Sequence, residues 1–322
     1  MKTCHICGTE NFETNNYCVH CGNRITKINI CPCCGEINDD MAKFCKYCSF
    51  QLNPIDIESF DDLFSEYNTQ LLADYNLTPQ MYVDILNSVF EKLKYTKVKG
   101  KTIKEKILNL CGVFARCYPK CREGELGHNF GNVIFYDERL DDSSQISALL
   151  HELAHCILFN LISSLLCEIF NVNHSPFIDS FVWFFLSNDD MLLLNEYCAS
   201  TVSGRFVPYG FQDYGSFKAE LKRREIDEQS LEKIIKLSIN FSNEICSRLD
   251  NYIDEALRED IKFQFKLDQK AENSNAFDFE ILSEFDFNDK NKLLLEYLLM
   301  YFVAARLPEF REELCDCLQL FE

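Results

Sequence analysis

The sequence predicts an α+β protein that is mostly helical and that begins with a cysteine-rich, metal-binding region. Two observations carry this prediction. Nine of the 18 cysteines lie before Phe50, most of them in Cys-x2-Cys pairs. Beyond that point apolar residues recur at helical spacing in several long segments, and one short segment near residue 133 has a β-rich composition.

The length and charge of the chain limit its class. With 322 residues, of which 47% are hydrophobic, the chain can bury the core of one large or two modest domains, so global disorder is excluded. Its formal net charge of -19 opposes nonspecific binding to nucleic acid or to an anionic membrane. No apolar segment precedes the first cysteine pair, so we expect a cytoplasmic protein with reduced or metal-bound thiols. The apolar stretches 156–166 and 181–186 are shorter than a membrane-spanning helix, which needs about 20 residues, and are predicted to be buried core.

The first fifty residues contain one cysteine unit twice, at a spacing of 27 residues. A Cys-x2-Cys turn places two thiolates on one side of a tetrahedron, and two such turns complete a closed zinc site. A glycine follows the second cysteine of three pairs, where the turn favours a residue without a Cβ. The sequence therefore predicts two structural zinc ions, held by Cys4, Cys7, Cys18 and Cys21 and by Cys31, Cys34, Cys45 and Cys48.

This segment, residues 1–50, resembles the tandem zinc ribbons of the double zinc ribbon family. The resemblance implies an interaction module. Five basic and five acidic side chains balance one another here, and each four-cysteine zinc site adds negative charge, so we expect a protein partner rather than DNA. Asn53-Pro54 and an acidic stretch then predict a linker over residues 51–62.

The elements that follow are predicted in order. Thr78-Pro79 starts a helix to about Tyr95, and a capping box at Thr102 starts another through about Tyr118. Residues 131–136 form a strand. Further along the chain, an amphipathic run covers 230–257, a polar loop covers 268–289, and an apolar helix over 292–307 is stopped by Pro308.

The chemistry is concentrated in His151-Glu152-Leu153-Ala154-His155, inside a predicted helix that covers 146–166. Histidines four residues apart share one helix face and can bind one zinc ion. Glu152 is turned around the helix axis from the two histidines, and it can act as general base toward a water at that metal. The sequence thus predicts one catalytic zinc, held by His151 and His155.

A catalytic zinc usually has three protein ligands, so a third donor is needed. Leu161 stands where the metzincin pattern requires histidine, which excludes that family. We prefer Glu196, because Asp189-Asp190 predicts the start of a helix through about Phe206 in which small residues follow Glu196 on one face. His174 and the acids between Asp179 and Asp190 remain alternatives.

A strand, the HELAH helix and Glu196-x-x-Ala199 together resemble the gluzincin metallopeptidases, and among them the ImmA/IrrE-like peptidases. The resemblance covers about residues 131–208. It implies a zincin-like core over 63–210, followed by a helical region over 211–322, and an enzyme that cleaves a protein inside the cell, often a regulator.

Two functions therefore stand as expectations. The first is an intracellular zinc metallopeptidase with Glu152 as its catalytic base, in which the ribbons recruit a partner or substrate. The alternative is a zinc-stabilised interaction protein whose zincin core has lost catalysis. A SprT-like protease also pairs HExxH with a zinc ribbon, but the ribbon order and the acidic charge count against it.

Overall fold

The protein divides into two compact units in its computed structural model. One unit comprises residues 1–57 with 171–173, and the other comprises 58–170 with 174–322. The first unit ends within the predicted linker over 51–62. The second unit contains both the predicted core over 63–210 and the predicted helical region over 211–322. The residues that the structure describes are 2–3, 9–11, 19–20, 29–31, 34–38, 42, 44–47, 52–96, 98–122, 124–272, 275, 277, 279 and 285–321.

In the first unit, two short antiparallel hairpins repeat the spacing of the cysteines. One joins β1 (Lys2–Thr3) to β2 (Glu10–Asn11), and the other joins β3 (Asn29–Ile30) to β4 (Ile37–Asn38). Each strand of the second hairpin lies 27 residues after its counterpart, which is the repeat of the cysteine pairs.

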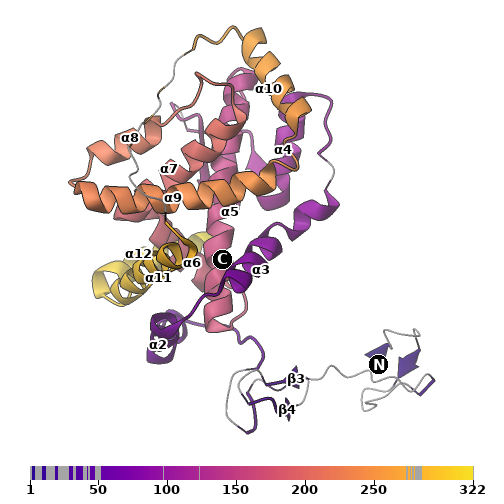
Figure 1. Ribbon diagram of the computed structural model, residues 1–322, viewed down its shortest axis with the longest axis vertical. Coiled ribbons are helices and arrows are strands. Elements are labelled where there is room, and N and C mark those ends of the chain that lie inside the picture. The colour runs from indigo at the N-terminus through magenta and orange to yellow at the C-terminus, as the bar shows by residue number, and fades with distance from the viewer. Residues whose placement is uncertain are drawn as a thin grey trace. The chain divides into compact units, whose positions relative to one another are not determined.

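The second unit is mostly helical, as predicted, with one small sheet (Figure 1). Side-chain caps start many of its helices, for example the predicted capping box between Thr102 and Glu105. The helices are α1 (Phe60–Leu63), α2 (Glu66–Asp74), α3 (Pro79–Val89), the 3-10 helix Glu91–Tyr95, α4 (Ile103–Phe114), α5 (Asp142–Phe170), α6 (Pro176–Ser187), α7 (Asp189–Phe206), α8 (Gly215–Lys222), α9 (Glu228–Leu249), α10 (Glu255–Leu267), α11 (Phe287–Ala304) and α12 (Pro308–Phe321).

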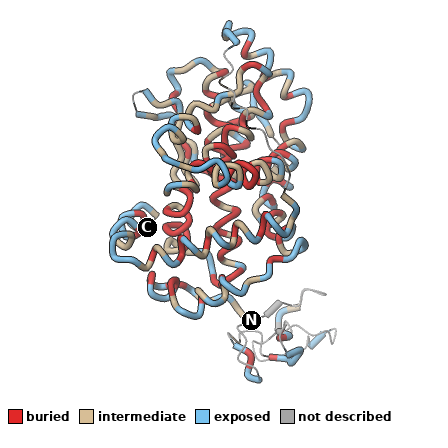
Figure 2. The backbone as a smooth tube through the Cα atoms, turned by 60° about the vertical axis from the view of Figure 1, so that its left-hand side comes forward, coloured by how far each residue is buried: buried red, intermediate tan, exposed pale blue. Residues whose placement is uncertain are grey.

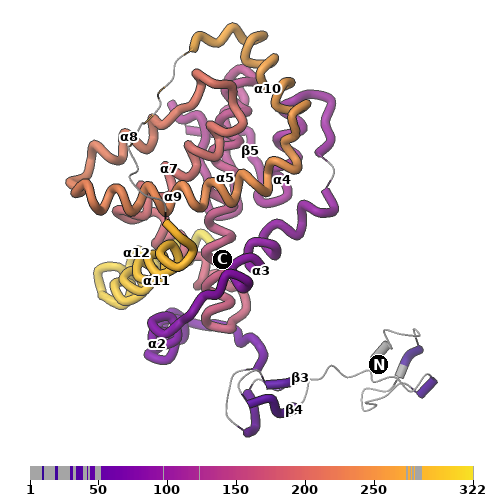
Figure 3. Tube along the Cα trace, viewed as in Figure 1, coloured from indigo at the N-terminus to yellow at the C-terminus, as the bar shows by residue number. Residues whose placement is uncertain are grey.

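Helix α5 is the central helix of this unit (Figure 3). The helices α2, α3, α4, α6, α7, α9 and α10 pack against it, while α8 packs on α7, and α11 and α12 pack on α6. The Asp141 carboxylate caps the start of α5 by accepting a hydrogen bond from the Ser144 amide (2.9 Å). At 29 residues, α5 is longer than the helix predicted over 146–166. By length and composition alone it is long and apolar enough to cross a membrane. However, 78% of its most apolar window is buried inside the protein, and Figure 2 shows the buried residues gathered along the central helices.

A three-stranded sheet covers one side of α5, with strand order β5-β7-β6. The strand β7 (Val133–Tyr136) was predicted, whereas β5 (Arg116–Tyr118) and β6 (Gly127–Phe130) were not. The predicted helix from Thr102 therefore ends at Phe114 rather than near Tyr118. The reason is tertiary, because Arg116 to Tyr118 pair in parallel with β7, which follows them by 17 residues.

Other helix boundaries also differ from the prediction. The amphipathic run 230–257 breaks after Leu249 and continues in α10, with Asp254 as a new cap. The apolar helix predicted over 292–307 is α11, which begins at Phe287 and already ends at Ala304, so Pro308 does not stop it. Pro308 instead starts α12, since proline suits the first turn of a helix. Asn188 rather than Asp189 occupies the N-cap position of α7. The apolar stretch 181–186, which was predicted to be buried core, lies in α6 and is mostly buried.

Candidate metal centre

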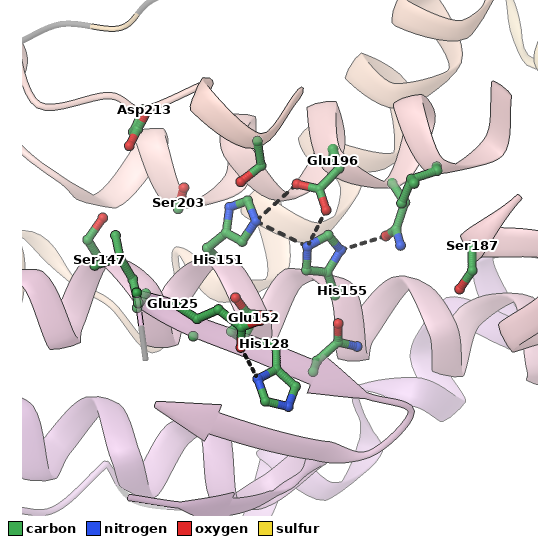
Figure 4. Close-up of a pocket in the computed structure, with 18 of the residues that line it drawn as sticks. Glu125, His128, Ser147, His151, Glu152, His155, Ser187, Glu196, Ser203 and Asp213 are labelled. Atoms are coloured by element: carbon green, nitrogen blue, oxygen red, sulfur yellow. Dashed lines mark hydrogen bonds and ion pairs between the residues drawn. The ribbon is translucent and has the colours of Figure 1, made fainter. Parts of the chain in front are cut away.

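The two histidines of the HELAH segment meet on one face of α5 (Figure 4). One helical turn separates them, so their rings lie edge to face with centroids 4.7 Å apart, and their Nε2 atoms are 3.1 Å apart. His155 is buried and His151 is nearly so. Two nitrogen lone pairs held this close repel unless a proton or a cation lies between them.

Glu196 completes the group from the neighbouring helix α7. Its carboxylate oxygens lie 3.4 Å from His151 Nε2 and 3.7 Å from His155 Nε2. The helices can approach closely because the residues that follow Glu196 on this face, Ala199 and Ser200, are small and fully buried. His174, the alternative third ligand, instead pairs with Asp179 at 2.9 Å.

Asn195 fixes the orientation of His155. Its side-chain NH2 donates to the Leu186 carbonyl, so its oxygen faces His155 Nδ1, 2.7 Å away. An amide oxygen only accepts hydrogen bonds, and His155 therefore carries its proton on Nδ1. The lone pair on Nε2 is left to face His151 and Glu196, which is the arrangement that metal-binding histidines use.

The three side chains fit a zinc ion. Tetrahedral zinc with bonds of about 2.0–2.1 Å to nitrogen and oxygen separates its donor atoms by about 3.3 Å. The observed separations are 3.1, 3.4 and 3.7 Å. In addition, Glu196 Oε2 is buried and accepts no hydrogen bond, which is costly for a carboxylate unless a cation occupies the site.

Glu152 points from α5 toward the sheet rather than toward the two imidazoles. Its side chain packs on Gly127 of β6, where a Cβ would lie 3.1 Å from both its Cγ and its Oε1. A side chain at position 127 would therefore force Glu152 to shift by a few tenths of an ångström. The glycine allows the carboxylate to lie between the metal-binding group and the edge of the sheet.

Burial and neighbouring charges give Glu152 and Glu196 very different pKa values. Burial raises the pKa of Glu152 to about 7, helped by the charges of Glu196 and Glu125 and opposed by His151. Burial alone would also raise the pKa of Glu196, but His155 and His151 lower it to about 2. Burial lowers the pKa of His155 to about 4, so this imidazole is neutral at pH 7. One carboxylate is thus ready to bind a cation and the other to exchange a proton.

These groups line a cavity of about 520 Å³. Helix α5, strand β6, helix α6 and helix α7 all contribute to its wall, so it is a built pocket of the second unit. The sequence had not indicated Asn195, Gly127 or Trp183 as members of this site. Only tertiary packing brings these three residues to the cavity, and none of them belongs to a motif that the sequence spacing would reveal.

In the first unit, three of the predicted cysteine ligands come together. Cys31, Cys34 and Cys45 lie within reach of one metal ion, and the Sγ atoms of Cys34 and Cys45 are 3.6 Å apart, close to the roughly 3.8 Å of a zinc tetrahedron. Gly35 has a φ of 74°, as the turn after the second cysteine requires. Asn38 donates from its amide to Cys45 Sγ (3.4 Å). Cys48 and the first set, Cys4, Cys7, Cys18 and Cys21, lie outside the described residues.

Replacing Asn195 with Ala should weaken zinc binding at the His151–His155–Glu196 site by about 10- to 100-fold, because it frees the His155 ring to rotate. Asn195→Asp keeps an acceptor at the same place and should retain most of the affinity. Chelator competition with the purified full chain measures both. Equal affinity of Asn195→Ala and wild type would show that Asn195 does not orient the ligand.

The raised pKa of Glu152 predicts how the metal-free protein responds to pH. Its folded pKa of about 7 exceeds the ordinary value of 4.5, so the folded state holds a proton that the unfolded state releases. The contribution of Glu152 to stability is therefore present below pH 4.5 and is lost as the pH rises toward 7. Urea unfolding of chelator-treated protein should show a loss of stability over this range that Glu152→Gln lacks, and parallel profiles would contradict the assignment.

Comparison with known proteins does not extend this description. A scan against family models found no match, and searches of the curated proteins and of the solved structures found no similar chain.

Proposed function

We propose that this protein is a zinc-dependent peptidase that hydrolyses peptide bonds at the His151–His155–Glu196 centre. The observation that carries the proposal is the position of Glu152, a buried carboxylate with a pKa of about 7 beside a three-residue donor set in an open pocket. A purely structural zinc site is closed by four protein ligands and has no need of such a group.

Each residue has a part in the reaction. When bound, zinc supplies a Lewis acid that polarises a carbonyl and makes water more acidic. Glu152 takes a proton from the attacking water as its oxygen bonds to the carbonyl carbon. Glu152 then gives the proton to the nitrogen as the carbon–nitrogen bond breaks. Burial raises the pKa of this carboxyl group in the metal-free protein, which favours its acceptance of the proton.

The strand β6 supports a peptide as the substrate. It is an edge strand of the sheet, and Gly127, His128 and Asn129 line the cavity beside Glu152. An extended peptide can add to such an edge through backbone hydrogen bonds, which would hold its carbonyl groups along the pocket. We propose that the substrate is an intracellular protein, as the gluzincin and ImmA/IrrE-like resemblance implies, and that the enzyme is cytoplasmic.

The N-terminal cysteine sites have a different part in the proposal. Closed four-cysteine sites leave no open position for a substrate, so we assign these tandem zinc ribbons to recruitment of a protein partner. In the alternative function, a non-catalytic interaction protein, the centre at His151 would bind zinc without turnover.

The test is cleavage of a peptide library by the full chain after chelation and after zinc is restored. Activity should disappear with the metal and return with it. A protein that rebinds zinc at this centre, as shown by its metal content, but cleaves no member of the library would favour the non-catalytic alternative.

A further inference from the structure

A second cluster of metal-binding side chains lies beside the same pocket. Cys121 and Glu125 come from the connection between β5 and β6, and His128 comes from β6 itself. Glu125 and His128 line the cavity, and Figure 4 shows them on the side of the pocket where Glu152 lies, across from Glu196. None of the three belongs to the HELAH centre.

The donor atoms of this cluster have the separations of a zinc tetrahedron. His128 Nδ1 lies 3.1 Å from Glu125 Oε2 and 3.5 Å from Cys121 Sγ, and Cys121 Sγ lies 3.7 Å from Glu125 Oε2. Zinc bonds of about 2.0 Å to nitrogen and oxygen and about 2.3 Å to sulfur predict about 3.3, 3.5 and 3.5 Å for the same three pairs. All three distances agree within about 0.2 Å.

The imidazole of His128 is held in place for such a role. It stacks on Phe135 of β7 with centroids 4.6 Å apart, and Phe135 also stacks with Tyr118 of β5. The side chains of Glu125 and His128 are 38% and 37% exposed, so an ion can reach them from solvent. Thiolate, imidazole and carboxylate together favour zinc over magnesium or calcium, which prefer oxygen donors alone.

We propose that Cys121, Glu125 and His128 form a second zinc site in the helical unit, separate from the HELAH centre. The ion would join the β5–β6 connection to β6 and so stabilise the wall of the pocket that faces Glu152. Three protein donors leave the fourth position of the tetrahedron for water.

Hydrogen bonding offers a competing account, because the thiol of Cys121 and the ring N–H of His128 can both donate to Glu125. The two accounts differ in their response to zinc. Only metal binding converts the Cys121 thiol into a bound thiolate that an alkylating reagent cannot attack.

The experiment is alkylation of the reduced, metal-stripped full chain with iodoacetamide, with and without added zinc, followed by mass spectrometry of each cysteine peptide. Zinc should slow the alkylation of Cys121 by about tenfold or more, as mass action requires when most sites are filled. Cys315, an exposed free thiol, is the internal control and should react at one rate throughout. Magnesium should give no protection of Cys121.

Variants locate the ligands. His128→Phe keeps a ring to stack on Phe135 but removes the donor, and Glu125→Gln removes the charge, so both should abolish the protection of Cys121. His174→Phe, which changes a histidine outside the cluster, should leave it intact. His151→Ala should also leave it intact, because it removes a ligand of the other centre and so separates this proposal from the proposed peptidase.

Two results would overturn the second site. One is an equal rate of Cys121 alkylation in wild type with and without zinc. The other is protection that survives both His128→Phe and Glu125→Gln, or that disappears in His151→Ala, since either pattern assigns the protection to another site.

Discussion

Replacing Glu152 with Gln should lower peptide turnover by about two orders of magnitude or more while the zinc content stays unchanged. Gln has nearly the shape of Glu and still fits against Gly127, where the space is tight. It cannot accept a proton from water, however. The zinc content should persist because the proposed ligand atoms belong to His151, His155 and Glu196.

The matched control is Glu168→Gln on the same helix. Glu168 is an exposed acid of α5, far along the helix from the HELAH segment, and its substitution should change neither turnover nor metal content. Steady-state cleavage of a peptide substrate and elemental analysis of the same samples give both quantities. A Glu152→Gln variant as active as wild type would remove the general base from the proposed mechanism.

Replacing Glu196 with Ala should remove one zinc ion per chain and abolish turnover with it. Two imidazoles alone form an incomplete site, and the loss of a ligand should exceed the roughly 10- to 100-fold loss of affinity expected from an outer residue such as Asn195. The effect differs from that of Glu152→Gln, in which turnover falls while the metal remains. This contrast separates the ligand from the base.

Glu296→Ala is the control for this second variant, because it deletes an exposed glutamate of α11. Zinc content, thermal unfolding and peptide cleavage should be measured on both variants and on wild type. If Glu196→Ala keeps the full zinc content and affinity, Glu196 is not a ligand. The gluzincin resemblance would then lose its main support.

Local sequence determined much of the helical framework. The capping box at Thr102 and the proline at the start of α3 mark helix starts through contacts within four residues, so the sequence alone predicts them. The strands β5 and β6 depend on partners at β7 and carry no strong pattern of their own. For the same reason the end of α4 was misplaced, since pairing with a distant strand overrides a local helical preference.

The sequence by itself also determined which residues on α5 could bind a metal. Histidines four residues apart share a helix face in any α-helix, and Cys31-x2-Cys34 places two thiols together in any tight turn. Glu196 was one of several candidate third ligands, and helix packing places it beside His151, whereas His174 pairs with Asp179.

Only the tertiary structure decided what surrounds these ligands. Asn195 orients His155 from another helix, and Gly127 makes room for Glu152 from a strand. The β5–β6 connection brings Cys121 and Glu125 together with His128, and no spacing in the sequence indicates this cluster. The physical reason is the different separation along the chain over which local and tertiary contacts act. A helical or turn spacing constrains side chains a few residues apart, whereas contacts between elements depend on how the whole core packs.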